Sequence, residues 1–168
     1  MKKSIFLAAL VLISAGCLAQ KANVSKARNM ADAETPDYAG ARAAIAEALQ
    51  NEETKEQANT WYVAGFIGYK EFETANLNRQ IGRNIDFDKW GAAVYESIGY
   101  WDKAYELAMI PTYDKKGKAK YDTRTPKNIL PKLQEYFVYQ PMIIAGFNAY
   151  EANNPSLAYD MFIKHCNI

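Results

Sequence analysis

Apolar side chains recur every three or four residues along most of this chain, which is the spacing of one face of an α-helix. Between Tyr38 and Leu49 the steps are three, four, three and one, and from Trp90 to Ala108 steps of three or four continue without interruption. No stretch of alternating apolar and polar residues reaches the length of a strand. The pattern therefore predicts an all-α protein.

Several helix starts are marked by a polar residue followed by proline. The polar side chain can accept a hydrogen bond from a free backbone N–H group, and proline suits the first helical turn. These pairs are Thr35-Pro36, Thr125-Pro126 and Asn154-Pro155, and Asp86 is a further capping residue. The sequence predicts about six helices, in residues 22–33, 36–51, 61–72, 86–110, 125–152 and from 155 onward.

Two prolines and two polar segments interrupt the helical pattern. Pro111 is expected to end the fourth helix, and Pro141 to kink the fifth or break it in two. Residues 76–83 are polar and predict a loop or frayed turn. Residues 111–125 are basic, contain Gly117 and lack periodicity, which predicts a second loop.

The basic loop carries Lys115, Lys116, Lys118 and Lys120, which is the composition of an anion-binding patch. We interpret it as a solvated connection between two helices. The alternative is contact with acidic lipid or polysaccharide headgroups at the cell envelope.

The N-terminus has the composition of a secretory signal. Met1-Lys2-Lys3 precedes an apolar run from Ile5 to Ile13 that is too short to span a bilayer, and small residues follow it. We predict a signal peptide over residues 1–19, cleaved after Ala19, and an exported protein in the periplasm or cell envelope. The alternative is a lipoprotein anchored at Cys17, and only that alternative would attach the protein to a membrane.

Charge and residue chemistry exclude several functions. Removal of Lys2 and Lys3 with the signal leaves 18 basic residues against 19 acidic ones, a net charge near −1, so we expect no nucleic-acid partner. His165 is the single histidine, and no Gly-rich phosphate loop or G-x-S-x-G turn occurs. We therefore expect no catalytic residues, no metal and no cofactor, and not an enzyme. The lone mature thiol, Cys166, is expected to be buried.

Small residues at helical spacing give the chain a resemblance to the tetratricopeptide repeat, a helix pair of about 34 residues. Gly65 and Ala104 are 39 residues apart, about 27 more than that repeat requires, so the middle unit would be irregular with an insertion around 73–86. The residues that match the repeat-packing positions are Ala41, Ile45, Ala48, Trp61, Ala64, Gly65, Ala104, Ala108, Ala145, Gly146, Ala158 and Phe162.

The resemblance extends to exported bacterial tetratricopeptide proteins that carry the sequence NTWYVAG and a basic KKGKxK loop. It implies one domain over residues 20–168, built of antiparallel helix pairs stacked as a short right-handed superhelix (an α-solenoid). In such a scaffold the first helices of stacked units line a concave groove. Tyrosines off the main apolar stripes would line that groove or pack between units, namely Tyr69, Tyr95, Tyr100, Tyr139 and Tyr150.

Two functions follow from this resemblance. The first is a non-enzymatic, exported scaffold that binds a protein or peptide partner in its groove. The alternative is a carbohydrate-binding helical protein of the cell envelope, similar to glycan-capture lipoproteins built on related repeats, in which aromatic rings would stack on sugars.

The C-terminal helix lacks a following element to cover it. Tyr159, Ile163 and Ile168 are expected to be exposed, and an apolar helix face left in water favours association. We therefore expect either self-association through this helix or continuation of the array in a longer protein.

Overall fold

The computed structural model describes residues 21–168. The predicted signal peptide, including Cys17, and Gln20 lie outside these residues. Residues 21–31 are helical, and one short antiparallel hairpin separates the fourth helix from the fifth. The other elements are α2 (Tyr38–Gln50), α3 (Ala58–Gln80), α4 (Phe87–Ala108), β1 (Thr112–Tyr113), β2 (Ala119–Lys120), α5 (Arg124–Tyr139), α6 (Pro141–Glu151) and α7 (Pro155–Cys166).

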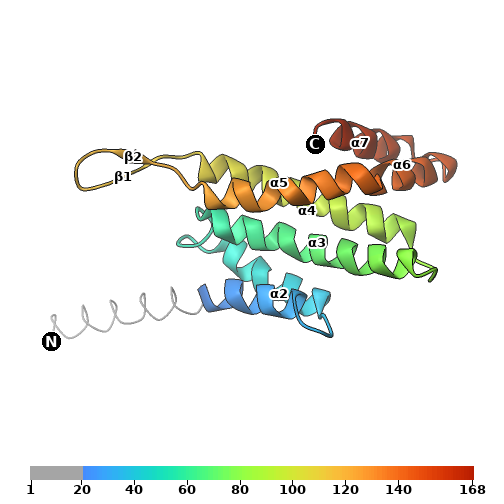
Figure 1. Ribbon diagram of the computed structural model, residues 1–168, viewed down its shortest axis with the longest axis horizontal. Coiled ribbons are helices and arrows are strands. Elements are labelled where there is room, and N and C mark those ends of the chain that lie inside the picture. The colour runs from blue at the N-terminus through green and yellow to red at the C-terminus, as the bar shows by residue number, and fades with distance from the viewer. Residues whose placement is uncertain (1–20) are drawn as a thin grey trace, which may run out of the picture.

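The helices pack in succession across an elongated molecule (Figure 1). Helix α3 packs against α2 on one side and most extensively against α4 on the other, and α6 packs against both α4 and α7. Helix α5 contacts α3 and α4. The prediction of an all-helical fold of packed helix pairs is therefore confirmed for the described residues, apart from the hairpin.

The described residues form seven helices rather than six, because the apolar stripe predicted over 125–152 is divided. Gln140 adopts a left-handed backbone conformation with φ 52°, and Pro141 begins α6. Proline has no N–H to continue the ladder of α5, so the chain turns at this point instead of kinking. Because the chain turns here, α6 does not continue along the axis of α5 and instead packs on α4.

Side-chain oxygens cap four helix starts, two at the predicted residues and two at neighbouring ones. Asp86 accepts a hydrogen bond from the backbone N–H of Lys89 (3.0 Å), as expected. Asn154 likewise caps α7. For α2 the capping residue is Asp37 instead of Thr35, and α5 begins at Arg124, where Asp122 accepts from the backbone N–H group of Arg124 (2.9 Å). A carboxylate close by replaces the predicted threonine at both sites.

The prediction of a loop over residues 76–83 is wrong for residues 76–80, which belong to α3. Helix α3 continues to Gln80, so the first part of the insertion expected around 73–86 is helical and only a short connection to α4 remains. Leu77 and Gln80 are exposed, and the guanidinium of Arg79 lies 5.2 Å from the ring centroid of Trp90. The segment shows no apolar stripe because water covers most of it.

The basic loop predicted over residues 111–125 folds into the β1–β2 hairpin. Thr112 pairs with Lys120 and Tyr113 with Ala119. Asp114 accepts hydrogen bonds from the backbone N–H groups of Lys116 (2.8 Å) and Lys118 (3.0 Å), and Gly117 adopts the positive φ of 74° that the turn requires. Strands of two residues are too short to show alternation in the sequence.

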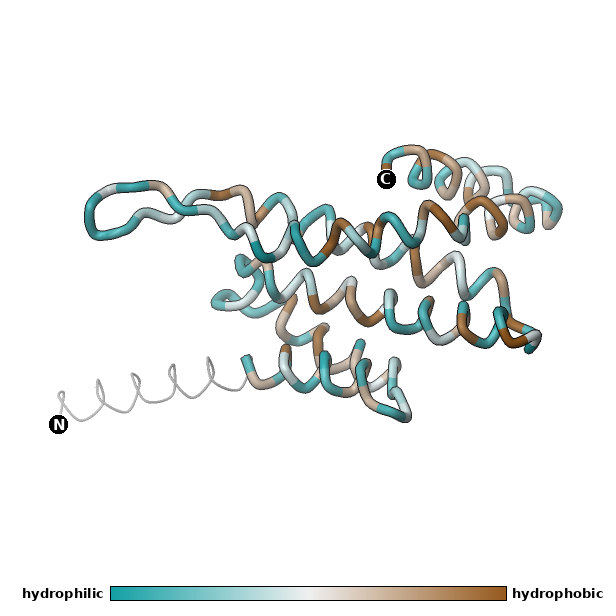
Figure 2. Tube along the Cα trace, viewed as in Figure 1, coloured by the Kyte–Doolittle hydropathy of each residue, from teal (hydrophilic) through white to brown (hydrophobic). Residues whose placement is uncertain are grey.

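Aromatic rings form the centre of the core, between α3, α4 and α5. Phe72 stacks on Trp90 with ring centroids 5.7 Å apart and meets the edge of Tyr136 at 4.8 Å. Trp101 stacks on Tyr136 and donates a hydrogen bond to the carbonyl of Tyr62 (3.1 Å). Figure 2 shows hydrophobic residues interspersed with hydrophilic ones along the helices, whereas the hairpin tip is hydrophilic.

Small residues let α3 and α4 approach closely. A side chain on Gly65 would overlap the ring of Trp101, and one on Gly68 would lie 2.5 Å from the carbonyl oxygen of Ala93. Gly146 similarly faces the ring of Phe162. Of the residues matched to repeat-packing positions, Trp61 and Phe162 are half-buried, and the buried ones are Ala41, Ile45, Ala48, Ala64, Gly65, Ala104, Ala108, Ala145, Gly146 and Ala158.

The C-terminal residues differ in part from expectation. Cys166 is exposed, so the prediction of a buried thiol is wrong; it follows His165, whose side chain takes the inward position on α7. Tyr159 and Ile163 are exposed, while Ile168 is half-buried against the core. In the described part of the chain, no helix combines the length and apolar character needed to cross a membrane.

Candidate functional site

One hollow lies along the C-terminal half of α3 and is called the α3 groove here. It is open and has a volume of about 390 Å³. All of its lining residues belong to α3, where spacings of three and four positions place them on one side of the helix. The lining residues are Lys70, Glu73, Thr74, Asn76, Leu77 and Gln80.

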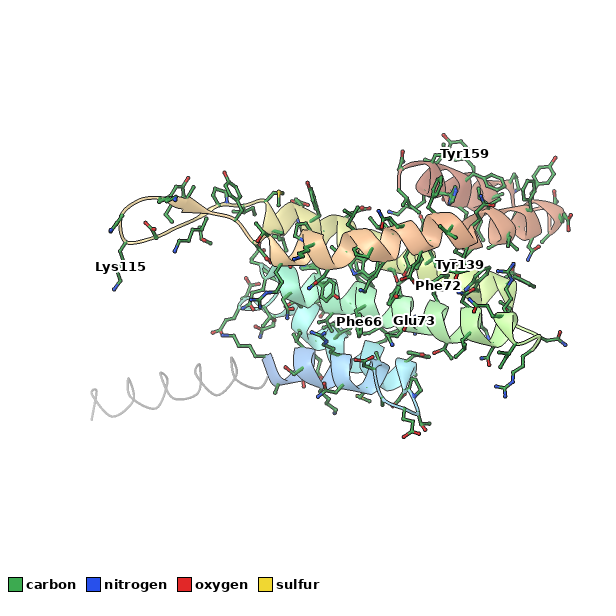
Figure 3. All side chains as sticks on the ribbon, viewed as in Figure 1. Phe66, Phe72, Glu73, Lys115, Tyr139 and Tyr159 are labelled. Atoms are coloured by element: carbon green, nitrogen blue, oxygen red, sulfur yellow. The ribbon has the colours of Figure 1, made fainter. Side chains whose placement is uncertain are left out.

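Cationic side chains cover two aromatic rings at the N-terminal side of this groove. The guanidinium of Arg28, from helix 21–31, lies 5.4 Å from the ring centroid of Phe66. The ammonium of Lys132, from α5, lies 4.8 Å from the ring centroid of Tyr69. Figure 3 shows Phe66 and Glu73 on the face of α3 between the α2 edge of the molecule and α5. Both cations favour the electron-rich ring faces.

Carboxylates from two helices converge on the hydroxyl group of Tyr69. Its oxygen lies 2.8 Å from Glu73 Oε1 and 3.1 Å from Glu135 Oε2. Burial and the hydrogen bond to Glu73 raise the pKa of Tyr69 well above its usual value, so the hydroxyl stays protonated. A hydroxyl has one proton to donate, so the two carboxylates compete for it. Lys70 neutralises Glu73 at 2.5 Å and also pairs with Asp32 at 3.1 Å.

Asn76 is an unusual residue for the interior of a helix and lines the α3 groove. The residue is only 7% exposed, and its Oδ1 has no hydrogen-bond donor among the residues that the structure describes. A buried amide oxygen without a donor costs on the order of 1–3 kcal/mol. Asn76 Oδ1 is therefore an unpaired acceptor beneath the groove, which an outside donor could reach only if the side chain turned toward the surface.

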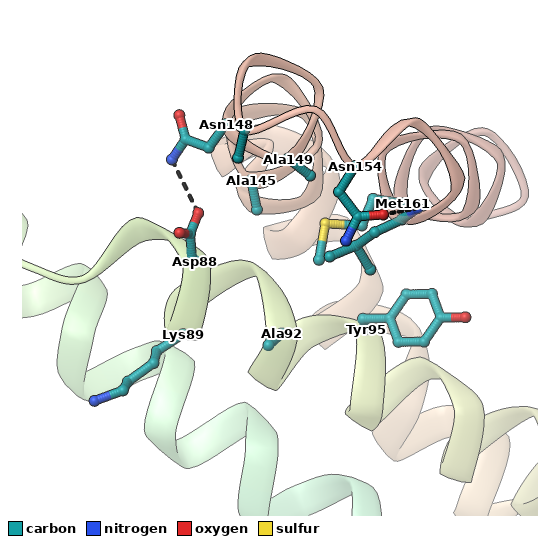
Figure 4. A pocket seen from close by; sticks show the side chains of 11 residues that line it. Asp88, Lys89, Ala92, Tyr95, Ala145, Asn148, Ala149, Asn154 and Met161 are labelled. Carbon is teal, nitrogen blue, oxygen red and sulfur yellow. Dashed lines mark hydrogen bonds between the residues drawn. The ribbon is translucent and has the colours of Figure 1, made fainter.

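A second hollow, of about 430 Å³, lies between α4, α6 and α7 (Figure 4). Its floor is apolar and includes Ala92, Ala145 and Met161, and Tyr95 stands at one side. The rim is polar: Asn148 Nδ2 donates to Asp88 Oδ1 at 3.1 Å, and Asn154 contributes a further amide. An apolar floor with a few polar groups at its rim is the usual composition of a ligand pocket.

The five tyrosines assigned to a groove from the sequence do not share one surface. Tyr69 is buried at the α3 groove, and Tyr139 lies near its far end, where its hydroxyl accepts a weak hydrogen bond from Gln80 (3.4 Å). The other three lie elsewhere: Tyr95 in the second hollow, Tyr100 half-buried beside Trp61, and Tyr150 exposed at the end of α6.

The sequence analysis missed Asn76, Lys132 and Glu135. An asparagine inside a helix is a signal that could have indicated Asn76, because this residue has low helix propensity. Lys132 and Glu135 stand about 60 residues from Tyr69 and have ordinary solvent-facing spacing, so no local pattern indicates them.

Residues that could hold a metal ion do not come together in the described chain. Within residues 21–168 no group of three or more His, Cys, Asp and Glu side chains is placed to hold a metal ion. His165 is buried and stacks on Phe137 with an interplanar angle of 2°, whereas the neighbouring Cys166 faces water.

No family model matches this chain, and neither does any curated protein or solved structure.

His165 provides a test of how α7 is packed. Burial lowers its pKa, and its Nδ1 has no partner in the described structure, so the folded state resists protonation. The contribution of neutral His165 is complete above the unfolded pKa of about 6.5 and is lost as the pH falls below it. We expect the urea midpoint to fall more between about pH 7 and pH 5.5 in the wild type than in His165→Gln. Equal decreases would mean that His165 is accessible to protons in the folded protein.

Proposed function

We propose that this protein is a non-enzymatic, exported scaffold that binds an extended peptide segment of a partner protein in the α3 groove. The resemblance to tetratricopeptide repeats supports a short right-handed superhelix in which helix 21–31, α3 and α5 line the inner face. The contacts of Arg28 and Lys132 with rings on α3 are consistent with that arrangement. Export follows from the signal-like residues 1–19.

The unpaired oxygen of Asn76 is the observation that carries this proposal. A buried polar group without a partner lowers stability and calls for an explanation, and among the four such side-chain atoms in the described residues Asn76 Oδ1 is the one whose residue lines the α3 groove. An extended peptide offers a free backbone N–H group at every residue other than proline. One such group can donate to Asn76 Oδ1 once the covered amide turns outward into the groove, while neighbouring residues of the peptide follow α3.

The charges in the groove favour a peptide over a small anion or cation. Lys70 is paired with Glu73 and Asp32, and Tyr69 is shared by Glu73 and Glu135. Cations and carboxylates therefore alternate along the groove, which leaves no uncompensated charge to dominate recognition. Hydrogen bonding and contact with the exposed side chain of Leu77 would provide most of the affinity.

Replacing Asn76 with leucine is expected to stabilise the protein and to weaken peptide binding. The substitution removes a buried unpaired oxygen, so we expect the free energy of unfolding to rise by about 1 kcal/mol in urea denaturation. Peptides selected on the wild-type protein from a random display library should bind the variant at least about tenfold more weakly by calorimetry, the loss of one buried hydrogen bond.

Asn59→Leu is the matched control, because Asn59 is exposed at the start of the same helix. It should bind the selected peptides as the wild type does. Selected peptides that bind Asn76→Leu with unchanged affinity would place their site elsewhere and refute the assignment to the α3 groove.

A second candidate function is carbohydrate binding in the hollow between α4, α6 and α7. The observation in its favour is the combination of a half-buried tyrosine, Tyr95, with a carboxylate and two amides at the rim. Sugars are bound by such groups, since a ring face packs on their C–H bonds and Asp or Asn pairs with their hydroxyls. Binding on a glycan array that is lost in Asp88→Ala, together with failure to select peptides, would favour this function.

A further inference from the structure

We propose that the β1–β2 hairpin binds the surface of a membrane that contains anionic phospholipids. The hairpin extends from the end of the helical body (Figure 1), and Lys115 stands at its tip (Figure 3). Every residue from Lys115 to Arg124 is exposed. The element is thus placed to reach a flat surface before the helices do.

Positive charge is concentrated on this element. Residues 111–125 contain four lysines and Arg124 but only two carboxylates, Asp114 and Asp122, which gives the segment a net charge of +3. The whole chain has a net charge of +1, so all the other residues together carry −2. An anionic surface would therefore attract the hairpin and repel the rest of the molecule, which orients the approach.

The acidic residues of the hairpin are engaged in its own backbone. Asp114 Oδ1 accepts from the N–H groups of Lys116 (2.8 Å) and Lys118 (3.0 Å), and its carboxylate is 3.9 Å from the ammonium of Lys120. Asp122 caps α5. Within the described chain, Lys115, Lys116 and Lys118 form no ion pair with a carboxylate. The tip is therefore a hydrogen-bonded turn that presents three ammonium groups without a carboxylate partner among residues 21–168.

The two faces of the hairpin differ in chemistry. Tyr113 pairs with Ala119 on one face, and Thr112 pairs with Lys120 on the other, because successive residues of a strand point to opposite sides. Tyr113, Tyr121 and Ile110 are all more than half exposed. Tyrosine prefers the boundary between water and lipid, where its ring is in an apolar layer and its hydroxyl remains wet.

This combination favours a lipid surface over a soluble polyanion. A polyanion would be bound by the lysines alone. The exposed tyrosine and isoleucine side chains contribute binding free energy only where an apolar layer is present. The start of helix 21–31 lies at the same end of the molecule as the hairpin (Figure 1). Cys17 precedes that helix by a few residues, so lipidation there would bring the same end to the membrane.

The test is flotation of the purified protein with vesicles rich in phosphatidylglycerol and with vesicles of pure phosphatidylcholine. We expect binding to the first only, and loss of that binding at high salt. Each lysine near an anionic surface raises the partition coefficient onto the vesicles about fivefold. The double variant Lys115→Gln with Lys116→Gln should therefore lower that coefficient about 25-fold. Lys89→Gln with Lys103→Gln, which removes the same charge from α4, should leave it within about twofold.

Tyrosine variants separate lipid from polyanion. Tyr113→Ser with Tyr121→Ser should weaken vesicle binding and leave binding to dextran sulfate unchanged. All variants keep the same N-terminus, so any contribution from it cancels, and circular dichroism melts verify the fold. Absence of a preference for phosphatidylglycerol, equal losses in the tip and α4 variants, or wild-type vesicle binding by the tyrosine variant would each overturn the proposal.

Discussion

Replacing Gly65 with leucine is expected to lower the free energy of unfolding by about 3 kcal/mol, because overpacking a close helix contact forces backbone movement. A Cβ atom at this position would overlap the indole ring of Trp101 and lie 2.8 Å from the carbonyl oxygen of Ser97. That carbonyl belongs to the backbone of α4 and cannot turn away. Ser97 also donates its hydroxyl to the carbonyl of Gly65 at 2.8 Å, so separating the helices would break this bond as well.

Gly99→Leu is the control for Gly65→Leu. Gly99 lies on the exposed side of α4, where an added side chain meets nothing within 4 Å. Its replacement should be neutral or raise stability by up to about 1 kcal/mol, since glycine is a poor helix former. Thermal and urea unfolding of both variants measure the difference. A Gly65→Leu protein as stable as the wild type would mean that α3 and α4 do not approach closely here, and would remove the main support for the resemblance to tetratricopeptide repeats.

Phe72→Ala is expected to be the most damaging truncation, with a loss of about 3–5 kcal/mol. The side chain is fully buried, stacks parallel to Trp90 and meets the edge of Tyr136. Its neighbours are held by three helices, so they cannot close the cavity that alanine leaves. Against a typical domain stability of about 5–15 kcal/mol, this loss would leave a marginally folded protein.

Phe147→Ala provides the comparison, because Phe147 is 58% exposed and its ring contacts mainly Phe162. Its truncation should cost about 1 kcal/mol, the contribution of one aromatic pair at the surface. The two variants are compared by urea denaturation. Similar losses in both would show that the aromatic cluster between α3, α4 and α5 is not the main core of the protein.

The local pattern predicts a helix when one side of that helix is buried and the other side faces water. Helix α4 keeps Trp90, Val94, Ile98 and Trp101 on a single buried stripe, so both its existence and its capping residue Asp86 follow from the sequence. Helix α3 is different: all residues from Tyr62 to Tyr69 are buried, because neighbours surround this half of the helix. Its second half is mainly polar, and most of its residues are half-buried or exposed. The first half was therefore recognised by its small and aromatic residues, which resemble the repeat, and the helix was lost near Asn76, where no apolar stripe continues.

The candidate site was only partly predictable for a related reason. Tyr69 was assigned to a groove because it falls at the margin of an apolar stripe; in the structure it is buried, and its hydroxyl contacts Glu73, which lines the α3 groove. Tyr95 and Tyr100 were assigned on the same grounds but lie on α4, away from the α3 groove. A position at a stripe margin indicates contact with a second neighbour, but it does not indicate which helix that neighbour is.

What the sequence determined by itself is local: the helical class, the capping at Asp86 and Asn154, the break at Pro141 and the concentration of lysine after Pro111. Each depends on interactions between residues a few positions apart, such as a side chain and the N–H groups of the next turn. Only the tertiary structure decided that Asn76 is buried without a donor, that Glu73 and Glu135 meet at Tyr69, and that the lysines stand on a projecting hairpin. These depend on packing between segments far apart in the chain, where the burial of whole helix faces overrides the local preferences of single residues.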